Sequence, residues 1–371
     1  MKMASAEAKN RDKKRRFPIF AVVASAAFLL FLIRSSVAIK YMKKGLDLCA
    51  GAVIPSLFPF MIISELLIQS GVGQRVGRLL AKPTRLLFGI SEAGACAFVL
   101  GAICGFPIGA KTLCSLYDRG EISSREFSRA LTFCNNPGSA FIISAVGVSL
   151  LGSVELGITL YGCVLLSAVI VGVFERIFFG KIGDGQSKSG YGAIAFERKG
   201  AIEVFTSAIQ SSAISMVTVC AYVVFFSSFV GCIGSIIAQA AIPSAVTAMI
   251  FGFFEISSGM GAAVEVGSPL VAVILCAAGA GWSGLSVHFQ IITICSGRGV
   301  SFKPFFIAKA AQGLICAALM WVALKIFPFS EEALARFPMV EGVGRAYSNA
   351  AFVCCVFFVA AVLPIVLGRR K

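Results

Sequence analysis

The sequence is poor in the residues that metal sites and hydrolytic enzymes use. Its 371 residues include a single histidine, His288, and its thirteen cysteines contain no Cys-x-x-Cys pair. Zinc and iron–sulfur sites usually need closely spaced cysteine and histidine ligands, so we expect no metal and no other cofactor. A Ser-His-Asp triad could use only His288, and neither a Gly-x-Ser-x-Gly elbow nor a Walker-type phosphate loop occurs. The chain is therefore predicted to be neither an enzyme nor an ATP-driven pump.

Charged residues are also scarce, at 14% of the chain, whereas 58% of the residues are hydrophobic and the mean hydropathy is +0.90. Apolar runs of about 20 residues recur, which is enough to cross a hydrocarbon core of about 30 Å. The predicted fold class is an all-α polytopic integral membrane protein, with the lipid bilayer as its partner. The net charge of +15 does not indicate nucleic acid, because the basic residues lie in short loops, as the positive-inside rule requires.

The two ends of the chain predict its orientation. Residues 1–16 carry seven lysines or arginines, and an apolar run follows from Phe17 to Ile39. No clean cleavage site precedes Arg34, so we expect an uncleaved first helix with a cytoplasmic N-terminus. Three basic residues, Arg369 to Lys371, end the chain and place the C-terminus on the same side.

Two apolar runs in the first half are interrupted by residues that break helices. The first interruption is Gly105–Lys111, with Gly105, Pro107 and Gly109, and the second is Asn135–Ser139, with Pro137 and Gly138. Interrupted backbone survives in lipid only where protein or a water-filled cavity covers it. Two such breaks close together are typical of a transporter site built from discontinuous helices. A pair of ordinary proline kinks is the alternative.

The second half repeats this plan with fewer charges. No lysine or arginine occurs between Lys199 and Arg298, so its internal loops are expected to face outward. Residues 242–280 are predicted to form an interrupted hairpin that is broken at Glu255–Gly261, with Gly259 and Gly261 in the break. Residues 281–295 are predicted to form a separate span with a glycine-weakened start.

These expectations give about eight transmembrane helices and two re-entrant hairpins, arranged as two inverted repeats. The predicted divisions are residues 1–44 (basic N-terminus and first helix), 45–179 (first repeat), 180–200 (flexible cytoplasmic linker), 201–328 (second repeat) and 329–371 (outer loop and final helix).

Four short strings carry a family resemblance: PSLFPF (55–60), GFPIGAK (105–111), CNNPGS (134–139) and WSGLSVHFQ (282–290). With them the chain resembles the YlbJ family of sporulation integral membrane proteins, within the nucleoside recognition or Gate-domain group. The family pattern Gly-Tyr/Phe-Pro-x-Gly-Ala-Lys is kept at the first break. Its second pattern, Asn-x-Ser/Asn-Pro, is matched only loosely by Asn135-Asn136-Pro137. The resemblance implies a Gate-like fold and a role in spore formation, in the inner membrane of a mother cell or forespore, but no particular solute.

Polar residues beside the breaks are the candidates for binding a substrate or an ion. Glu255 follows an apolar run, and a carboxylate at membrane depth is costly unless it has a partner. Lys111 could pair with an anion or with Glu255, or serve as a positive-inside anchor. Asn135, Asn136 and Ser139 could bind a solute or merely cap the break. Ser283, Ser286 and Gln290 share one helical face, which lines a cavity or bonds to a neighbouring helix.

The sequence thus favours a transporter-like Gate-domain protein that moves or binds a small polar solute such as a nucleoside. The alternative is a structural protein of spore assembly without transport activity. A homodimer is expected only by analogy with the fold group.

Overall fold

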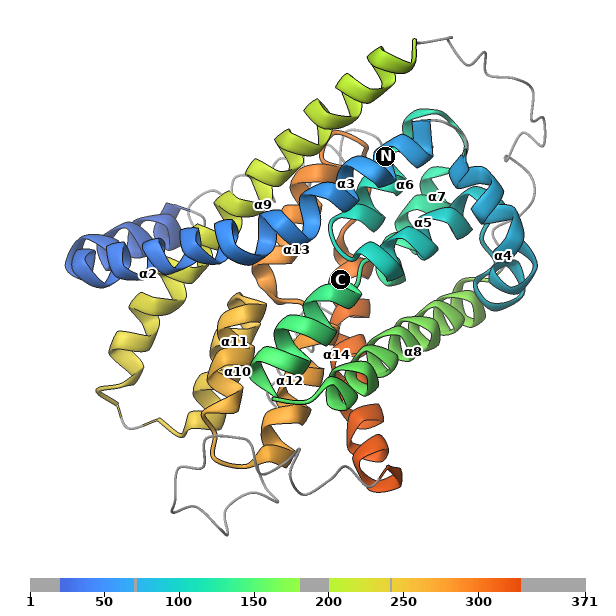
Figure 1. Ribbon diagram of the computed structural model, residues 1–371. Helices are drawn as coiled ribbons and strands as arrows, with labels where there is room; N and C mark the ends of the chain where they lie inside the picture. Colours follow the sequence, from blue (N-terminus) through green and yellow to red (C-terminus); the bar gives the residue numbers. More distant parts are fainter. Residues whose placement is uncertain (1–20, 70–71, 181–199, 241, 328–371) are drawn as a thin grey trace, which may run out of the picture.

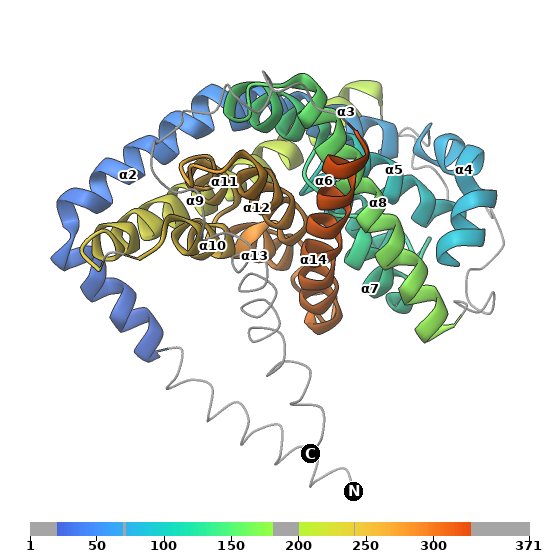
Figure 2. The same cartoon turned by 90° about the horizontal axis from the view of Figure 1, so that it is seen from below.

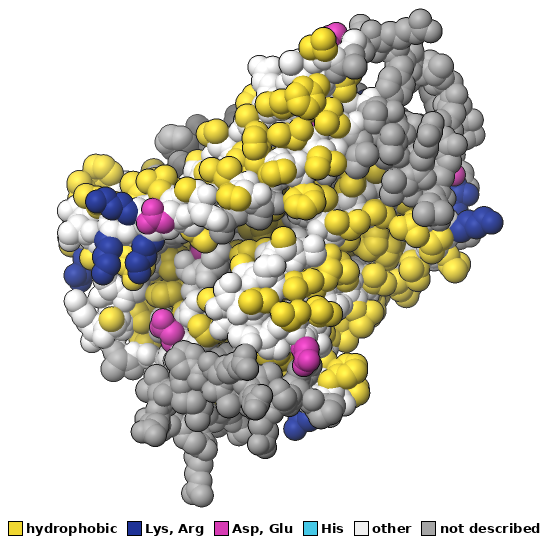
Figure 3. Space-filling model, viewed as in Figure 1, with side chains coloured by type: hydrophobic (Ala, Val, Ile, Leu, Met, Phe, Trp, Pro, Cys, Tyr) yellow, Lys and Arg dark blue, Asp and Glu magenta, His cyan; other side chains and the backbone are white. Residues whose placement is uncertain are grey.

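A computed structural model describes residues 21–69, 72–180, 200–240 and 242–327, and these ranges contain helices and no strands (Figure 1). The predicted final span, the basic N-terminus and most of the 180–200 linker lie outside the described residues. Where it can be seen, the prediction of a helical multi-pass membrane protein is confirmed. Four helices are long and apolar enough to cross a membrane, and the number rises to six if two sharply bent helix pairs each count as one span. Hydrophobic side chains cover much of the visible surface (Figure 3).

The N-terminal arm consists of consecutive helices with one sharp bend between them. A helix over Ala21–Ile33 bends by 97° at Arg34 into Ser35–Gly51. The helix α2 (Ser35–Leu48) then continues through a π-helical turn, η1 (Cys49–Val53), into α3 (Ile54–Gln69), with Pro59 inside α3. The helix continues through residues 40–44, because lysines do not interrupt a helix and no proline or glycine precedes Gly45 in α2. This arm packs along α9 (Ala201–Ile237).

The rest of the first half consists of short helices and one long one. They are α4 (Val72–Phe88), α5 (Glu92–Cys104), α6 (Ile108–Asp118), α7 (Ser124–Phe133), the π-helix η2 (Ala140–Leu150) and α8 (Val154–Phe179). α4 stays helical through Pro83, and its Leu80–Phe88 part makes an angle of 94° with α5. The α5–α6 pair packs as the expected interrupted hairpin, with its break at residues 105–107.

The second half begins with α9 and continues with α10 (Ser244–Phe254), α11 (Ile256–Val264), α12 (Pro269–Trp282), α13 (Gly284–Cys295) and α14 (Lys303–Ile326). The core lies where α14 packs against α12 on one side and α8 on the other, an arrangement visible in both ribbon views (Figures 1 and 2).

Two details of the second half correct the sequence-based expectation. The hairpin breaks at Glu255 alone, whereas Gly259 and Gly261 lie within α11. A Cβ at Gly259 would overlap the backbone of Gly252, so this glycine lets α10 and α11 approach closely rather than breaking the helix. Residues 281–295 belong to a longer candidate membrane span, Pro269–Cys295, which α12 and α13 form together with an interruption at Ser283.

Candidate functional site

In the first half the two helix breaks lie against each other. The Phe106 amide, at the α5–α6 break, donates to the Asn136 carbonyl at 2.7 Å. A Cβ at Gly105 would overlap the backbone of Gly138, and Gly105 also has a φ of +81°. The unwound segment between α7 and η2 therefore passes directly over the tip of the α5–α6 hairpin, at a separation that only glycine permits.

The second half contains an equivalent crossing. The Trp282 indole, at the end of α12, donates to the Phe253 carbonyl at 3.0 Å, one residue before the end of α10. A Cβ at Gly284 would lie 3.0 Å from the Ile256 amide nitrogen. Ser283 between α12 and α13 has a φ of 74°, a left-handed conformation that non-glycine residues rarely adopt. Each half thus brings a broken hairpin and a broken helix together at their interruptions.

A buried polar cluster connects the first-half break to α14 of the second half. The Lys309 ammonium donates to the Asn135 carbonyl at 2.6 Å and to the Gln312 Oε1 at 2.8 Å, and it lies 3.5 Å from the Asn136 Oδ1. The Gln312 amide donates to the Asn136 Oδ1 at 2.7 Å and to the Ser167 hydroxyl of α8 at 3.3 Å. All five side chains are fully buried. We call this group, Asn135, Asn136, Ser167, Lys309 and Gln312, the Lys309 cluster.

Lys309 and Gln312 were not among the residues singled out from the sequence. The signal was present, because Lys309 is a lone cation within the apolar run of α14 and an intramembrane charge indicates a functional site by default. Gln312 carries no comparable signal, since an uncharged glutamine can simply hydrogen-bond to a neighbouring membrane helix.

Glu255 is buried, as a functional carboxylate at membrane depth should be, but its two oxygens are already used. They accept from the Ser257 amide at 3.0 Å and the Ser258 amide at 2.7 Å, which caps the N-terminus of α11. A carboxylate in this place is favoured by the free amides and by the positive end of the helix dipole. The geometry therefore supplies a structural reason for Glu255 that needs no ligand.

Lys111 does not meet Glu255. Its ammonium lies 3.3 Å from a carboxylate oxygen of Glu65 on α3 and 3.4 Å from the Ser212 hydroxyl on α9. The other Glu65 oxygen accepts from Gln69 at 2.9 Å. Lys111 is therefore neither a free anion site nor a simple surface anchor, because it forms an ion pair with Glu65 within the first half and a hydrogen bond to Ser212 in the second half.

The remaining candidates are split between two places. Ser283, Ser286 and Gln290 are buried in the second-half break, where the Gln290 amide donates to the Ser286 hydroxyl at 3.3 Å and Ser283 bonds within its own turn. Ser139 is at the other break and donates to the Ile103 carbonyl at 3.2 Å. Five buried polar atoms have no partner in the described part of the chain: Thr112 Oγ1, Arg129 Nε, Asn135 Oδ1, His288 Nε2 and Gln290 Oε1.

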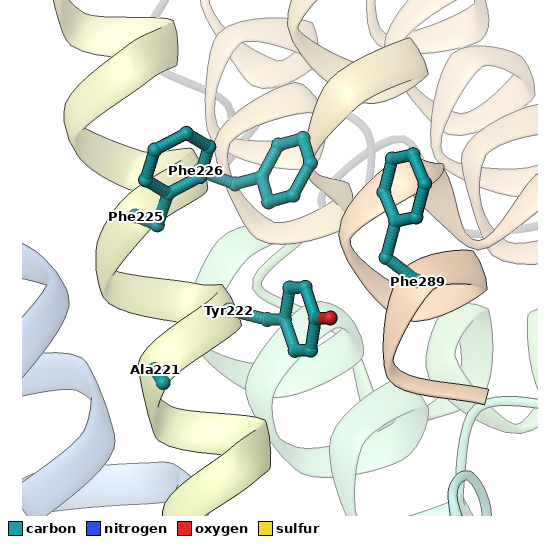
Figure 4. A pocket seen from close by; sticks show the side chains of 5 residues that line it. All are labelled: Ala221, Tyr222, Phe225, Phe226 and Phe289. Atoms are coloured by element: carbon teal, nitrogen blue, oxygen red, sulfur yellow. The ribbon is translucent and has the colours of Figure 1, made fainter. Parts of the chain in front are cut away.

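A groove of about 260 Å³ opens beside α9, but none of the candidate site residues lines it. It is lined by Ala221, Tyr222, Phe225, Phe226 and Phe289, and Figure 4 shows the aromatic rings gathered between α9 and α13. Its only polar group, the Tyr222 hydroxyl, is 2.7 Å from the Thr293 hydroxyl. This groove suits an apolar occupant and not a polar solute. Among the described residues, no group of three His, Cys, Asp or Glu could hold a metal ion.

The comparison with known proteins finds a relative that aligns with most of the chain. Over 338 aligned residues the chain is 29% identical to the sporulation integral membrane protein YlbJ of Bacillus subtilis (strain 168), covering 81% of this chain and 82% of the relative. This similarity supports assigning the chain to the YlbJ family. No protein-family model and no solved structure matches it. The YlbJ assignment agrees with the sequence resemblance and, together with the apolar helices, places the protein in a membrane that it crosses several times.

Proposed function

We propose that this protein acts in sporulation as a transporter-like membrane protein that binds and moves a small polar solute between its two halves. The sporulation role rests on the YlbJ relative, whose name describes a sporulation integral membrane protein. The transport role rests on the helix breaks, because unwound backbone within a membrane protein is typical of solute and ion sites.

The two halves would be inverted repeats that each supply one broken hairpin and one broken helix. α5–α6 would correspond to α10–α11, α7–η2 to α12–α13, and α8 to α14. This proposal is supported by the equivalent crossings, Phe106 on Asn136 in one half and Trp282 on Phe253 in the other. The termini would both lie in the cytoplasm, with the solute entering between the crossings.

The Lys309 cluster is the single observation that carries the proposal. Burying a lysine, two asparagines and a glutamine at membrane depth is costly, and stability alone is served better by apolar residues. We infer that the polar groups at this contact would exchange hydrogen-bond partners when the two halves move, which gives alternating access a second stable arrangement.

The experiment is ligand-induced thermal stabilisation of the full chain in detergent. The panel holds nucleosides, nucleobases, amino acids, dipicolinate and phosphate esters. A ligand at 100 times its dissociation constant stabilises the folded state by about 2.7 kcal/mol. We expect one solute class to raise the apparent Tm of the wild type and not of Asn135→Ala, which removes the unpaired Asn135 Oδ1 at the break. Ser149→Ala, an exposed serine on η2, is the matched control and should respond like the wild type.

The second candidate is a structural protein of spore assembly, and the closed geometry of the candidate residues favours it. Glu255, Lys111 and Asn136 already bond to other parts of the chain. On this reading, variants at the breaks would support spore formation whenever they fold. Spore counts for Asn135→Ala, at protein levels equal to those of Ser149→Ala, separate the two functions.

A further inference from the structure

The Lys309 ammonium sits in an unusual setting for a buried charge. Within the described ranges no carboxylate lies within ion-pair distance of it, whereas Lys111 and Arg298 each have one. Its acceptors are instead three carbonyl-type oxygens, namely the Asn135 main chain, the Asn136 side chain and the Gln312 side chain. The neutral oxygens around this ammonium are the kind of ligands that a free monovalent cation would need.

The main-chain carbonyl of Asn135 is also placed as a cation ligand would be. Asn135 follows the C-terminus of α7, where unpaired carbonyls carry the negative end of the helix dipole. The neighbouring carbonyls are already occupied, Leu131 by the Asn135 amide and Phe133 by the Asn136 amide. The Asn135 carbonyl therefore remains free to face the charge. In broken membrane helices, such unwound carbonyls coordinate sodium or other small cations.

The side-chain oxygens are also held in place. The Gln312 amide nitrogen donates to Asn136 and to Ser167, which fixes its Oε1 toward the ammonium. The Asn136 amide nitrogen donates to the Phe133 carbonyl, which turns its Oδ1 toward Lys309 and Gln312. Because the oxygens are orientated by separate bonds to α7 and α8, the cage does not depend on the lysine alone.

We propose that the Lys309 cluster is a monovalent-cation site filled by the chain's own ammonium. The three oxygens are neutral, which suits a single positive charge, whereas divalent ions prefer carboxylate ligands. The tethered ammonium takes the place that a free sodium, potassium or small ammonium ion would hold between the halves. Any solute transport by this protein is then not coupled to the binding of a sodium ion at this position.

The test removes the tether and offers a free cation in its place. Wild type, Lys309→Ala and Lys309→Met are purified as full chains in detergent, and their thermal unfolding is followed in sodium, potassium, methylammonium or choline chloride at equal ionic strength. Alanine leaves room for a cation, methionine fills the space with an apolar chain, and choline is too large for the vacated site. Lys325→Ala removes an exposed lysine near the end of the same helix and is the matched control.

We expect sodium, potassium or methylammonium to raise the apparent Tm of Lys309→Ala by about 2 °C or more relative to choline. Wild type, Lys309→Met and Lys325→Ala should show no such difference. If Lys309→Ala can be purified as a folded protein only in one of the small-cation salts, that outcome also supports the proposal. Failure of all three small cations to stabilise or recover Lys309→Ala overturns the proposal. The measurement contains no solute, so its outcome is independent of the transport function proposed above.

Discussion

Arg298 and Asp118 form a bidentate ion pair between segments that are 180 residues apart, with nitrogen–oxygen distances of 2.6 and 2.8 Å. Asp118 ends α6 in the first half, and Arg298 follows α13 in the second half. The Asp118 carboxylate raises the pKa of the Arg298 guanidinium. The contribution of the charged Arg298 to stability is therefore present at neutral pH and is lost as the pH rises through the raised pKa of its guanidinium.

The first prediction is that this pair adds little to stability despite its geometry. Asp118 is half exposed, so solvent and salt screen the attraction, and exposed pairs typically contribute about 0.2–1 kcal/mol. A double-mutant cycle with Asp118→Asn and Arg298→Gln, read by thermal unfolding at low and high salt, should give a coupling in that range that shrinks with salt. A coupling that is larger and independent of salt would contradict this expectation.

The second prediction concerns Gly94, which lies under a buried carboxylate. The Glu126 Oε1 accepts from the Ser91 amide at 2.6 Å, and a Cβ at Gly94 would come within 2.7 Å of the same oxygen. Gly94→Ala should displace Glu126, leave the Ser91 amide without its partner and cost about 1–3 kcal/mol. Thermal unfolding measures this loss. Gly162→Ala on α8 meets nothing within 4 Å and should be neutral or stabilising; an equal loss in both variants would refute the steric explanation.

The interruptions were predictable because proline and glycine act locally. Pro107 and Pro137 each lie where a helix is broken. Bends without such residues were missed, as at Arg34, where the helix turns by 97°. Gly259 was predicted to break a helix, but it lies within a helix and allows close packing against Gly252. The local sequence does not distinguish these two roles of glycine.

The candidate site was predicted less completely, because side-chain partners depend on contacts distant in sequence. Asn135 and Asn136 were found from the break, but their partners Lys309 and Gln312 are more than 170 residues away. Glu255 was chosen because a buried charge needs a partner, and its partners proved to be amides two and three residues ahead. A charge in an apolar run can thus be recognised from sequence, whereas the group that compensates it cannot.

The third prediction tests the internal support of the Lys309 cluster. Gln312→Leu removes one of the three acceptors of the Lys309 ammonium and the nearer of the two donors to the Asn136 Oδ1, so each of these buried groups loses a hydrogen bond. The expected loss of stability is about 1–3 kcal/mol for each lost hydrogen bond. Gln210→Leu, on an exposed face of α9, is the matched control and should change the apparent Tm little. Similar Tm values for the two variants would mean that the cluster is hydrated or loosely held.

The fourth prediction separates the capping role of Glu255 from an ionic one. Serine is a good N-cap and is uncharged, so Glu255→Ser keeps a capping oxygen while it removes the carboxylate. Glu255→Ala removes both, and its loss of one buried cap should cost about 1 kcal/mol more than that of Glu255→Ser. If Glu255 only caps α11, Glu255→Ser should support spore formation at a normal protein level, and Glu255→Ala should fail in proportion to its lost stability. If the carboxylate binds a coupling ion or a solute, both variants should fail although Glu255→Ser is folded. Because both oxygens are engaged by Ser257 and Ser258, we expect the first result, and a folded but inactive Glu255→Ser would refute it.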